Sequence, residues 1–229
     1  MHPLDNVIWQ ALSTRQSHFG RDHGGMKRFL PEVSVLAGFP SSTEQDYELL
    51  ASVLQPGERI GLFLEHSLRQ MPQFKQVISA PLLEMVCDNG RTSQSSYSAA
   101  EIVPLAAENV DEMLALTALT LPGPFGPRTH EMGDYFGIRN NGTLIAMSGE
   151  RLKVPGYTEI SAVCTHPEHL GKGYARALMS LIMERIVARG ETAFLHVRAD
   201  NARAIGLYES LGFRNRITLQ YVVLEKLAA

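Results

Sequence analysis

Hydrophobic residues recur along the chain with two spacings, one typical of helices (about 3.6 residues) and one of strands (two residues). In the first hundred residues the elements expected are helix 6–19, strand 32–39, helix 42–54, strand 59–65 and strand 82–87. Pro40 closes the first of these strands, and Ser42 followed by Gln45 predicts a capping box at the start of the second helix. This part of the chain is therefore expected to form a small α/β unit.

The second half has a more regular pattern. Asn141-Gly142 between two apolar runs predicts a tight hairpin, because these residues tolerate the positive φ angles that such a turn requires. The elements expected are helix 109–119, strands 134–139, 143–152 and 158–165, a helix from Tyr174, strand 193–197, helix 201–211 and strand 218–226. Strands and helices in this order indicate an α/β fold built on a mixed sheet.

A polar segment rich in small residues, Asp88 to Glu101, lies between the two halves. Its composition is typical of a linker. The sequence therefore predicts an N-terminal α/β subdomain at 1–98 and a second domain at 99–229.

A glycine-rich turn precedes the helix from Tyr174. Its sequence is Leu170-Gly171-Lys172-Gly173-Tyr174-Ala175. Free N–H groups at a helix N-terminus favour a phosphate, and glycines remove the Cβ atoms that would prevent close approach. A P-loop is excluded because Gly173, rather than Ser or Thr, follows Lys172. A dinucleotide fingerprint is incomplete because Arg176 stands at its third glycine position.

This turn and a downstream stretch together resemble the Gcn5-related N-acetyltransferase (GNAT) superfamily, most closely its FR47-like branch. Members carry Gln/Arg-x-x-Gly-x-Gly/Ala at the start of a helix, and later Asn-x-x-Ala-x-x-Leu-Tyr-x-x-Leu-Gly-Phe, which the chain has at 201–213. The resemblance covers roughly 101–227. It implies a GNAT fold with splayed central parallel strands. Separately, the order helix, strand, helix, strand, strand in residues 1–98 is similar to a degenerate half of the same superfamily.

The resemblance also implies an activity: transfer of an acetyl group from the cosubstrate acetyl-CoA to a primary amine, by direct attack in a ternary complex. The chain departs from the family pattern at Leu170, where Gln or Arg is usual. Lys172 or Arg176 is expected to compensate electrostatically. A non-catalytic acyl-CoA-binding sensor is the alternative function.

Carried over residue by residue, the family pattern implies a coenzyme site along a strand edge, the turn and the next helix. Its residues are Ala162, Val163, Cys164, Thr165, Leu170, Gly171, Lys172, Gly173, Tyr174, Ala175, Asn201 and Tyr208. The N–H of Val163 is expected to polarise the thioester carbonyl, and Asn201 is expected to cap its helix.

The resemblance places two catalytic residues. Tyr208 is expected to protonate the leaving thiolate, and Glu159, eleven residues before Leu170, matches the catalytic base of Gcn5-type members. Glu150 is the alternative base and a possible substrate contact.

Three further residues, Arg128, His130 and Tyr135, lie where the acceptor-side segment of the family varies, and are candidates for contacting substrate.

The cysteine and histidine residues indicate neither a catalytic nucleophile nor a metal site. Cys164 stands in an apolar strand, where cysteine usually behaves as a small buried hydrophobe. His166 and His169 are expected to be loop residues near the phosphates, so no metal is predicted.

The composition of the chain limits the classes of partner that it can bind. A net charge of −3 over 229 residues argues against a nucleic-acid-binding surface, and no apolar run approaches the length of a membrane span. The first residues lack the features of a secretory signal, and two cysteines without CxxC spacing fit a reducing compartment. We expect a cytoplasmic enzyme that acts on a small-molecule or peptide amine. Whether residues 1–98 wall the acceptor cleft or form a homodimer interface stays open.

Overall fold

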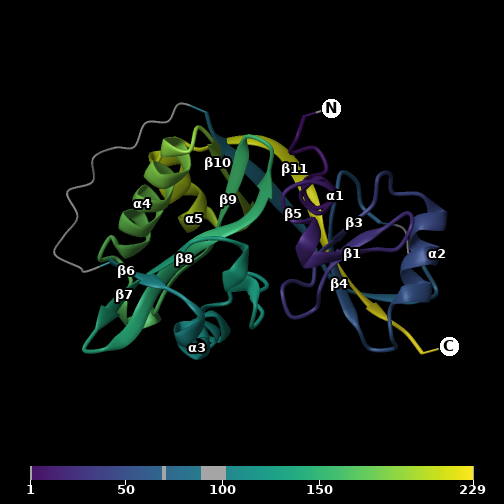
Figure 1. Cartoon of the computed structure of the whole chain (residues 1–229), viewed down its shortest axis with the longest axis horizontal. Helices are drawn as coiled ribbons and strands as arrows, with labels where there is room; N and C mark the ends of the chain where they lie inside the picture. The colour runs from purple at the N-terminus through teal and green to yellow at the C-terminus, as the bar shows by residue number, and fades with distance from the viewer. Residues whose placement is uncertain (1, 69–70, 89–101, 229) are drawn as a thin grey trace.

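The computed structural model describes residues 2–68, 71–88 and 102–228. Its helices are α1 (Val7–Ser13), α2 (Glu44–Val53), α3 (Val110–Thr120), α4 (Tyr174–Ala188) and α5 (Ala202–Ser210). Its strands are β1 (Gly20–Asp22), β2 (Lys27–Phe29), β3 (Ala37–Gly38), β4 (Arg59–Leu64), β5 (Phe74–Cys87), β6 (Ile102–Leu105), β7 (Tyr135–Asn140), β8 (Thr143–Val154), β9 (Tyr157–Thr165), β10 (Thr192–Arg198) and β11 (Arg214–Lys226). The mixed α/β class is confirmed (Figure 1). No helix of these ranges is both long and apolar enough to span a membrane.

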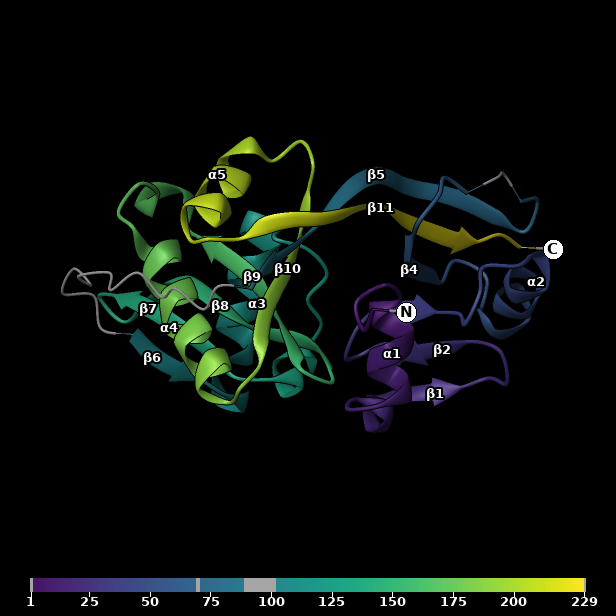
Figure 2. The same cartoon turned by 90° about the horizontal axis from the view of Figure 1, so that it is seen from above.

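The main sheet has eight strands in the order β4-β11-β5-β10-β9-β8-β7-β6. Only β9 and β10 run parallel among these neighbouring described strands; the other pairs are antiparallel. β5 comes from the first half of the sequence, yet it lies between β10 and β11 of the second. Figure 2 shows β5 and β11 side by side, running from the α5 end of the molecule to the α2 end. The two halves therefore share one sheet.

The expected division into domains 1–98 and 99–229 stays a prediction, since its boundary and most of the expected linker, 89–101, lie outside the described residues. The pairing of β5 with both β10 and β11 nevertheless shows that hydrogen bonding crosses from one half to the other.

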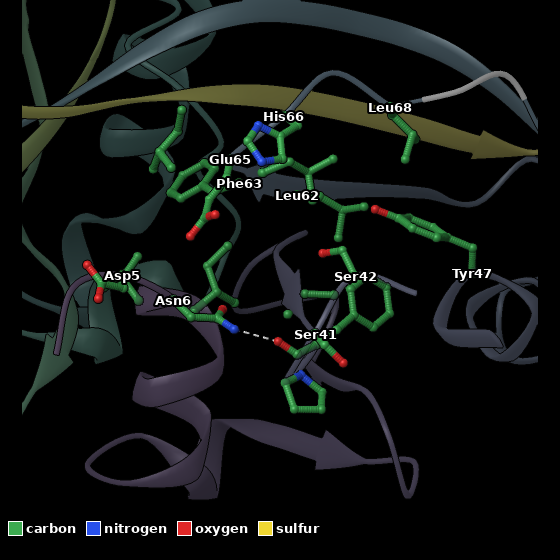
Figure 3. Close-up of a pocket in the computed structure, with 18 of the residues that line it drawn as sticks. Asp5, Asn6, Ser41, Ser42, Tyr47, Leu62, Phe63, Glu65, His66 and Leu68 are labelled. Carbon is green, nitrogen blue, oxygen red and sulfur yellow. Dashed lines mark hydrogen bonds between the residues drawn. The ribbon is translucent and has the colours of Figure 1, made fainter. Parts of the chain in front are cut away.

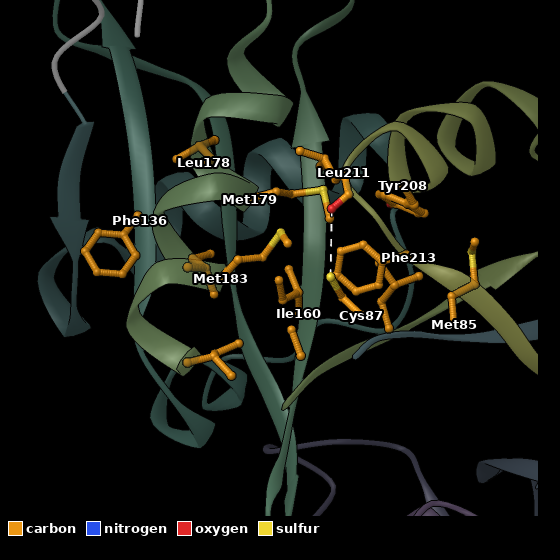
Figure 4. Packing of buried hydrophobic residues seen from close by; sticks show 14 of the residues in the cluster. Met85, Cys87, Phe136, Ile160, Leu178, Met179, Met183, Tyr208, Leu211 and Phe213 are labelled. Atoms are coloured by element: carbon orange, nitrogen blue, oxygen red, sulfur yellow. Dashed lines mark hydrogen bonds between the residues drawn. The ribbon is translucent and has the colours of Figure 1, made fainter. Parts of the chain in front are cut away.

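Helices cover both faces of the sheet. α4 and α5 pack on one face, and Figure 4 shows Leu178, Met179 and Met183 of α4 pointing toward the strands that carry Ile160 and Met85. α3 packs against β8 and β9 with a separate apolar cluster. A third cluster joins α1 of the first half to Phe194 of β10, so the halves also share a hydrophobic core.

The expected helix 6–19 is shorter than predicted: α1 ends at Ser13, and a 3-10 turn, η1 (Ser17–Phe19), follows. Between them, Gln16 is buried and its amide bonds the carbonyl of Arg151 and the N–H of Lys153, at 2.7 and 3.0 Å. Those backbone groups lie where the β8–β9 register shifts. Gln16 therefore lies outside the regular helix, where its side chain bonds backbone groups of β8 that the shifted β8–β9 register leaves unpaired.

Two more expectations for the first half are wrong in detail. The capping box of α2 is formed by Thr43 and Asp46, not by Ser42 and Gln45. The expected strand 32–39 is reduced to β3, because the N–H groups of Val33 and Ser34 turn back to the carbonyl of Leu30.

The sequence pattern also missed long parts of β5 and β11. β5 begins at Phe74 rather than at 82, and β11 at Arg214 rather than at 218. Most residues in the first half of β5 are partly or fully exposed, so the strand lacks the apolar alternation that a half-buried sheet imposes. The short β6 was also missed.

The packing around Tyr135 predicts a steric requirement for Gly149. A Cβ atom added at Gly149 would lie 2.2 Å from the ring of Tyr135. Gly149→Ala should therefore lower the free energy of unfolding by about 1–3 kcal/mol, as overpacking does. Urea denaturation measures this loss.

Gly206→Ala is the matched control, because a Cβ there meets nothing within 4 Å in α5 and should stabilise the chain by up to about 1 kcal/mol. Equal stability of Gly149→Ala and the unsubstituted chain would contradict the packing.

Candidate functional site

The parallel strands β9 and β10 diverge in the middle of the sheet. Their pairing ends at Phe194 and Glu159. Beyond that point β10 continues along β5 as far as Arg198, whereas the described structure records no strand paired with the β10-facing edge of β9. We call the space between these diverging strands the wedge. Its open strand edge can pair with an extended ligand.

A β-bulge marks the open part of β9. Between the pairs Met147–Cys164 and Gly149–Ser161, β9 has one residue more than β8, and Ala162 takes a φ of +51°. A bulge re-aims the backbone beside it. Four of the expected coenzyme-binding residues, Ala162, Val163, Cys164 and Thr165, lie on this arm.

The glycine turn opens at the start of α4. Gly171 and Gly173 have φ values of +80° and +82°, and a Cβ atom at either would meet nothing within 4 Å. In the described structure the N–H groups of residues 171–176 donate to no backbone acceptor outside the helix. A turn at a helix N-terminus that has free N–H groups, and no Cβ atom at Gly171 or Gly173, fits a pyrophosphate. We call this turn the cradle.

The side chains around the turn offer fewer groups for binding a phosphate than its backbone does. Leu170 is 46% exposed. The Lys172 ammonium lies 3.3 Å from His169 Nδ1, and Arg176 donates to Ser210 on α5. The turn therefore presents backbone N–H groups with two cations beside them.

α5 carries two of the expected residues. Asn201 caps the helix, since its side chain accepts from the N–H of Ala204 at 3.1 Å, which confirms its capping role. Tyr208 is 7% exposed and packs in the α4–α5 core (Figure 4). Burial, together with its neighbour Cys164 on β9, raises the pKa of Tyr208 to about 12. Tyr208 thus lies close to the open arm of β9.

The Cys164 thiol is itself unreactive. Burial raises the pKa of this thiol to about 11, so it is protonated at neutral pH. The expectation of a buried hydrophobic cysteine is consistent with this setting.

Glu159 is 1% exposed and fully paired. Both its oxygens accept from the Arg151 guanidinium, at 2.7 and 2.8 Å, and His196 Nδ1 lies 2.7 Å from Oε1. Burial alone would raise the pKa of Glu159, but the charge and hydrogen bonds of Arg151, with those of His196, lower it to about 2. These contacts weigh against a role as base, which stays a prediction.

Glu159 belongs to a row of alternating charges across five neighbouring strands and the segment before α1. In spatial order the row consists of Arg151, Glu159, His196, Glu84, Arg216 and Asp5. Burial favours a neutral imidazole, but Glu159 and Glu84 outweigh it and raise the pKa of His196. We call these six residues the charge row. It crosses the point where β9 and β10 separate.

Sequence reasoning missed the other members of the charge row. The available signal was an ionisable residue inside an apolar strand, Glu84 in "LLEMVC" and His196 in "AFLHV".

The remaining candidates lie apart from the wedge, except Tyr135, which packs with Ala162 and Cys164 of the open arm of β9. Glu150 is buried and ion-paired with Arg189 and Lys153, at 2.6 and 2.8 Å. Arg128 pairs with Glu131 and, at 3.2 Å, with Glu32 of the first half.

The other two acceptor-side candidates differ in their surroundings. His130 is close to the carbonyl of Pro127, at 3.1 Å. Tyr135 is buried, its hydroxyl has no partner among the described residues, and burial raises its pKa strongly.

One described group could hold a metal: His166, Glu168 and His169, whose ligand atoms lie within 4.8 Å of one another. The Lys172 ammonium beside His169 disfavours a second cation there.

Comparisons with known proteins agree with this geometry. The model of the FR47-like protein family matches residues 135–222. The N-alpha-acetyltransferase RimI of Mycobacterium tuberculosis (strain ATCC 25618 / H37Rv) is 36% identical over 83 residues, 35% of this chain and 51% of that protein. The ribosomal protein bS18 alanine N-acetyltransferase of Escherichia coli (strain K12) is 35% identical over 86 residues, 37% of this chain and 57% of that protein. The chain thus spans about half the length of the curated relatives it matches.

Solved structures extend the likeness to the whole chain. A GCN5-related N-acetyltransferase from Kribbella flavida has a TM-score of 0.61 over 98% of this chain and 97% of its own, at 17% identity, which shows a shared fold. A protein of the GNAT family from Novosphingobium aromaticivorans DSM 12444 has a TM-score of 0.90 at 36% identity. That match covers 100% of both chains, and this chain therefore belongs to the GNAT family.

Proposed function

We propose that the chain is an acetyl-CoA-dependent N-acetyltransferase that transfers an acetyl group to a primary amine by direct attack in a ternary complex. The observation that carries the proposal is the wedge, with the glycine turn at the start of α4 and Tyr208 beside the open arm of β9. The names of the matched relatives, which are N-acetyltransferases, support an amine as acceptor.

The chain's own residues can hold the cosubstrate. The N–H groups of Gly171 to Arg176 would bind the pyrophosphate, with Lys172 adding charge. The open edge from Ala162 to Thr165 would pair with the amide groups of the pantetheine arm, and the N–H of Val163 would polarise the thioester carbonyl. Acetyl-CoA supplies the acetyl group as an activated thioester.

Tyr208 is proposed to protonate the departing thiolate. A phenol with a pKa of about 12 remains protonated at neutral pH and can donate. The Tyr208 hydroxyl can therefore give its proton to the thiolate as the thioester bond breaks.

The amine must attack as its free base. Both carboxylates considered as the base, Glu159 and Glu150, are buried and paired with cations. We therefore propose that Glu159 fixes the apex of the wedge, and that the ammonium form of the amine releases its proton to solvent before it reaches the thioester. After the attack, the surplus proton on the new amide nitrogen passes to the Tyr208 phenolate, which restores the acid.

Gly173→Ala tests the cradle. A Cβ at this positive φ costs about 1–2 kcal/mol of stability and would obstruct a bound phosphate. We expect calorimetry to show acetyl-CoA affinity reduced at least about tenfold.

Gly190→Ala is the control, because Gly190 has a φ of +73° and equally open surroundings but follows the other end of α4. It should lose similar stability and retain affinity. Equal affinity in both variants would remove the turn from the coenzyme site.

Tyr208→Phe tests the acid. Loss of a general acid should lower kcat about a hundredfold or more, while the acetyl-CoA dissociation constant stays unchanged. Single-turnover CoA release measures the first and calorimetry the second. Unchanged turnover would exclude Tyr208 as the acid, and tight binding of acetyl-CoA without transfer to any amine would favour the sensor function.

Glu159→Gln distinguishes an ion pair from a base. The folded pKa of about 2 lies below the unfolded value of about 4.3, so the carboxylate stabilises the fold above about pH 4.3 and this contribution, about 3 kcal/mol, is lost as the pH falls toward 2. Urea denaturation between pH 7 and 3 should show an acid loss that is larger by about 2 kcal/mol in the unsubstituted chain than in the variant, because the other paired carboxylates are present in both. If the variant keeps its stability but loses the ascending limb of the pH–rate profile, Glu159 is the base after all.

A further inference from the structure

A second cavity lies in the first half of the chain, away from the glycine turn. It has a volume of about 660 Å³ and is enclosed by the start of α1, the segment from β3 to α2, the end of β4 and Leu219 of β11 (Figure 3). A volume of this size suits a small molecule. We call it the α1–β4 pocket.

The charged groups of the α1–β4 pocket are mainly acidic. Its lining includes Asp5, Glu44 and Glu65, and neither lysine nor arginine contributes to it. Asp5 is already paired with Arg216. Glu65 is exposed and makes no hydrogen bond or ion pair with any described residue, and Figure 3 shows its carboxylate turned into the space between β4 and α1. The exposed His66 beside it also lines the pocket. Glu65 is therefore an acidic group that a cationic ligand can reach and pair with.

A buried donor points into the same space. Tyr47 is 5% exposed, and its hydroxyl makes no hydrogen bond within the described ranges. Burial raises the pKa of this phenol, and Ser42 offsets part of the rise. Figure 3 shows the hydroxyl directed toward Ser42 and Leu62. An unpaired buried hydroxyl is costly unless a ligand or water completes it.

The wall of the α1–β4 pocket contacts a buried residue at the apex of the wedge. Phe63 lines the pocket, and its ring centroid lies 4.6 Å from that of His196 on β10. Leu219 pairs with Leu82 of β5, which in turn pairs with Arg198 at the end of β10. Two strand spacings of about 4.8 Å separate the pocket wall from the open arm of β10, about 10 Å in all.

We propose that the α1–β4 pocket binds a second cationic group of the acceptor, carried on an apolar arm remote from the reacting amine. The inference rests on the proposed function and names its substrate class. Glu65 would pair with the cation, the Tyr47 hydroxyl would bond a polar atom beside it, and Phe63 with Leu62 would contact the arm. Residues from the first half would thus select the acceptor.

The test compares 1,8-diaminooctane with 1-aminooctane, which lacks the second cation, as acceptors with acetyl-CoA. The diamine should have a KM at least about fivefold lower, beyond the factor of two from its second amine. Glu65→Gln and Tyr47→Phe should reduce this preference, and Glu48→Gln, an equal charge change on an exposed α2 residue outside the pocket, should leave it intact. The tripeptide amides Ala-Leu-Lys and Ala-Leu-norleucine distinguish a peptide from a free diamine as the source of the cation.

Equal KM values for the two amines, or a preference that Glu65→Gln leaves unchanged, would overturn the inference while acetylation itself stands. If no amine is acetylated, the proposed function fails, and calorimetry of the acetyl-CoA-free chain with the two amines still decides the pocket. Diamine-selective binding that Glu65→Gln weakens and Glu48→Gln does not would support the pocket; its absence would reject it.

Discussion

The charge row is the constraint on which the rest of the structure depends. Six buried or half-buried ionisable groups follow one another across β8, β9, β10, β5 and β11 to the segment before α1, with basic and acidic groups alternating along the row. Removing one partner of such a chain leaves an uncompensated buried charge, a loss of about 3–5 kcal/mol. The row therefore fixes the register of five strands and the attachment of the first half at once.

The wedge follows from this arrangement. His196 lies just beyond the last pair of β9 with β10 and contacts both Glu159 and Glu84. Past this point β10 stays paired with β5, while β9 turns away at its bulge. The divergence leaves a strand edge open beside Tyr208, with the glycine turn at the end of the following loop. A site for an acyl-CoA and a site for its acceptor can then lie on the two sides of one opening, and β5 places the first half next to it.

The sequence predicted the second half well, because its signals are local. Gly171 and Gly173 form the expected turn before α4, Asn201 caps α5, and the hairpin at Asn141-Gly142 forms. The first half of β5 has neither a motif nor apolar alternation. Its place between β10 and β11 depends on pairing with strands distant in the sequence, which no local pattern predicts. The same holds for Glu159: its spacing from Leu170 could not show that Arg151 and His196 enclose it.

The central claim is that the edge of β9 and the turn before α4 hold acetyl-CoA. Hydrogen–deuterium exchange with and without acetyl-CoA tests it at the backbone amides concerned. The account predicts slower exchange in residues 160–165 and 171–177 when acetyl-CoA is present, and no change in α2. Unchanged exchange in both segments at saturating acetyl-CoA would contradict it.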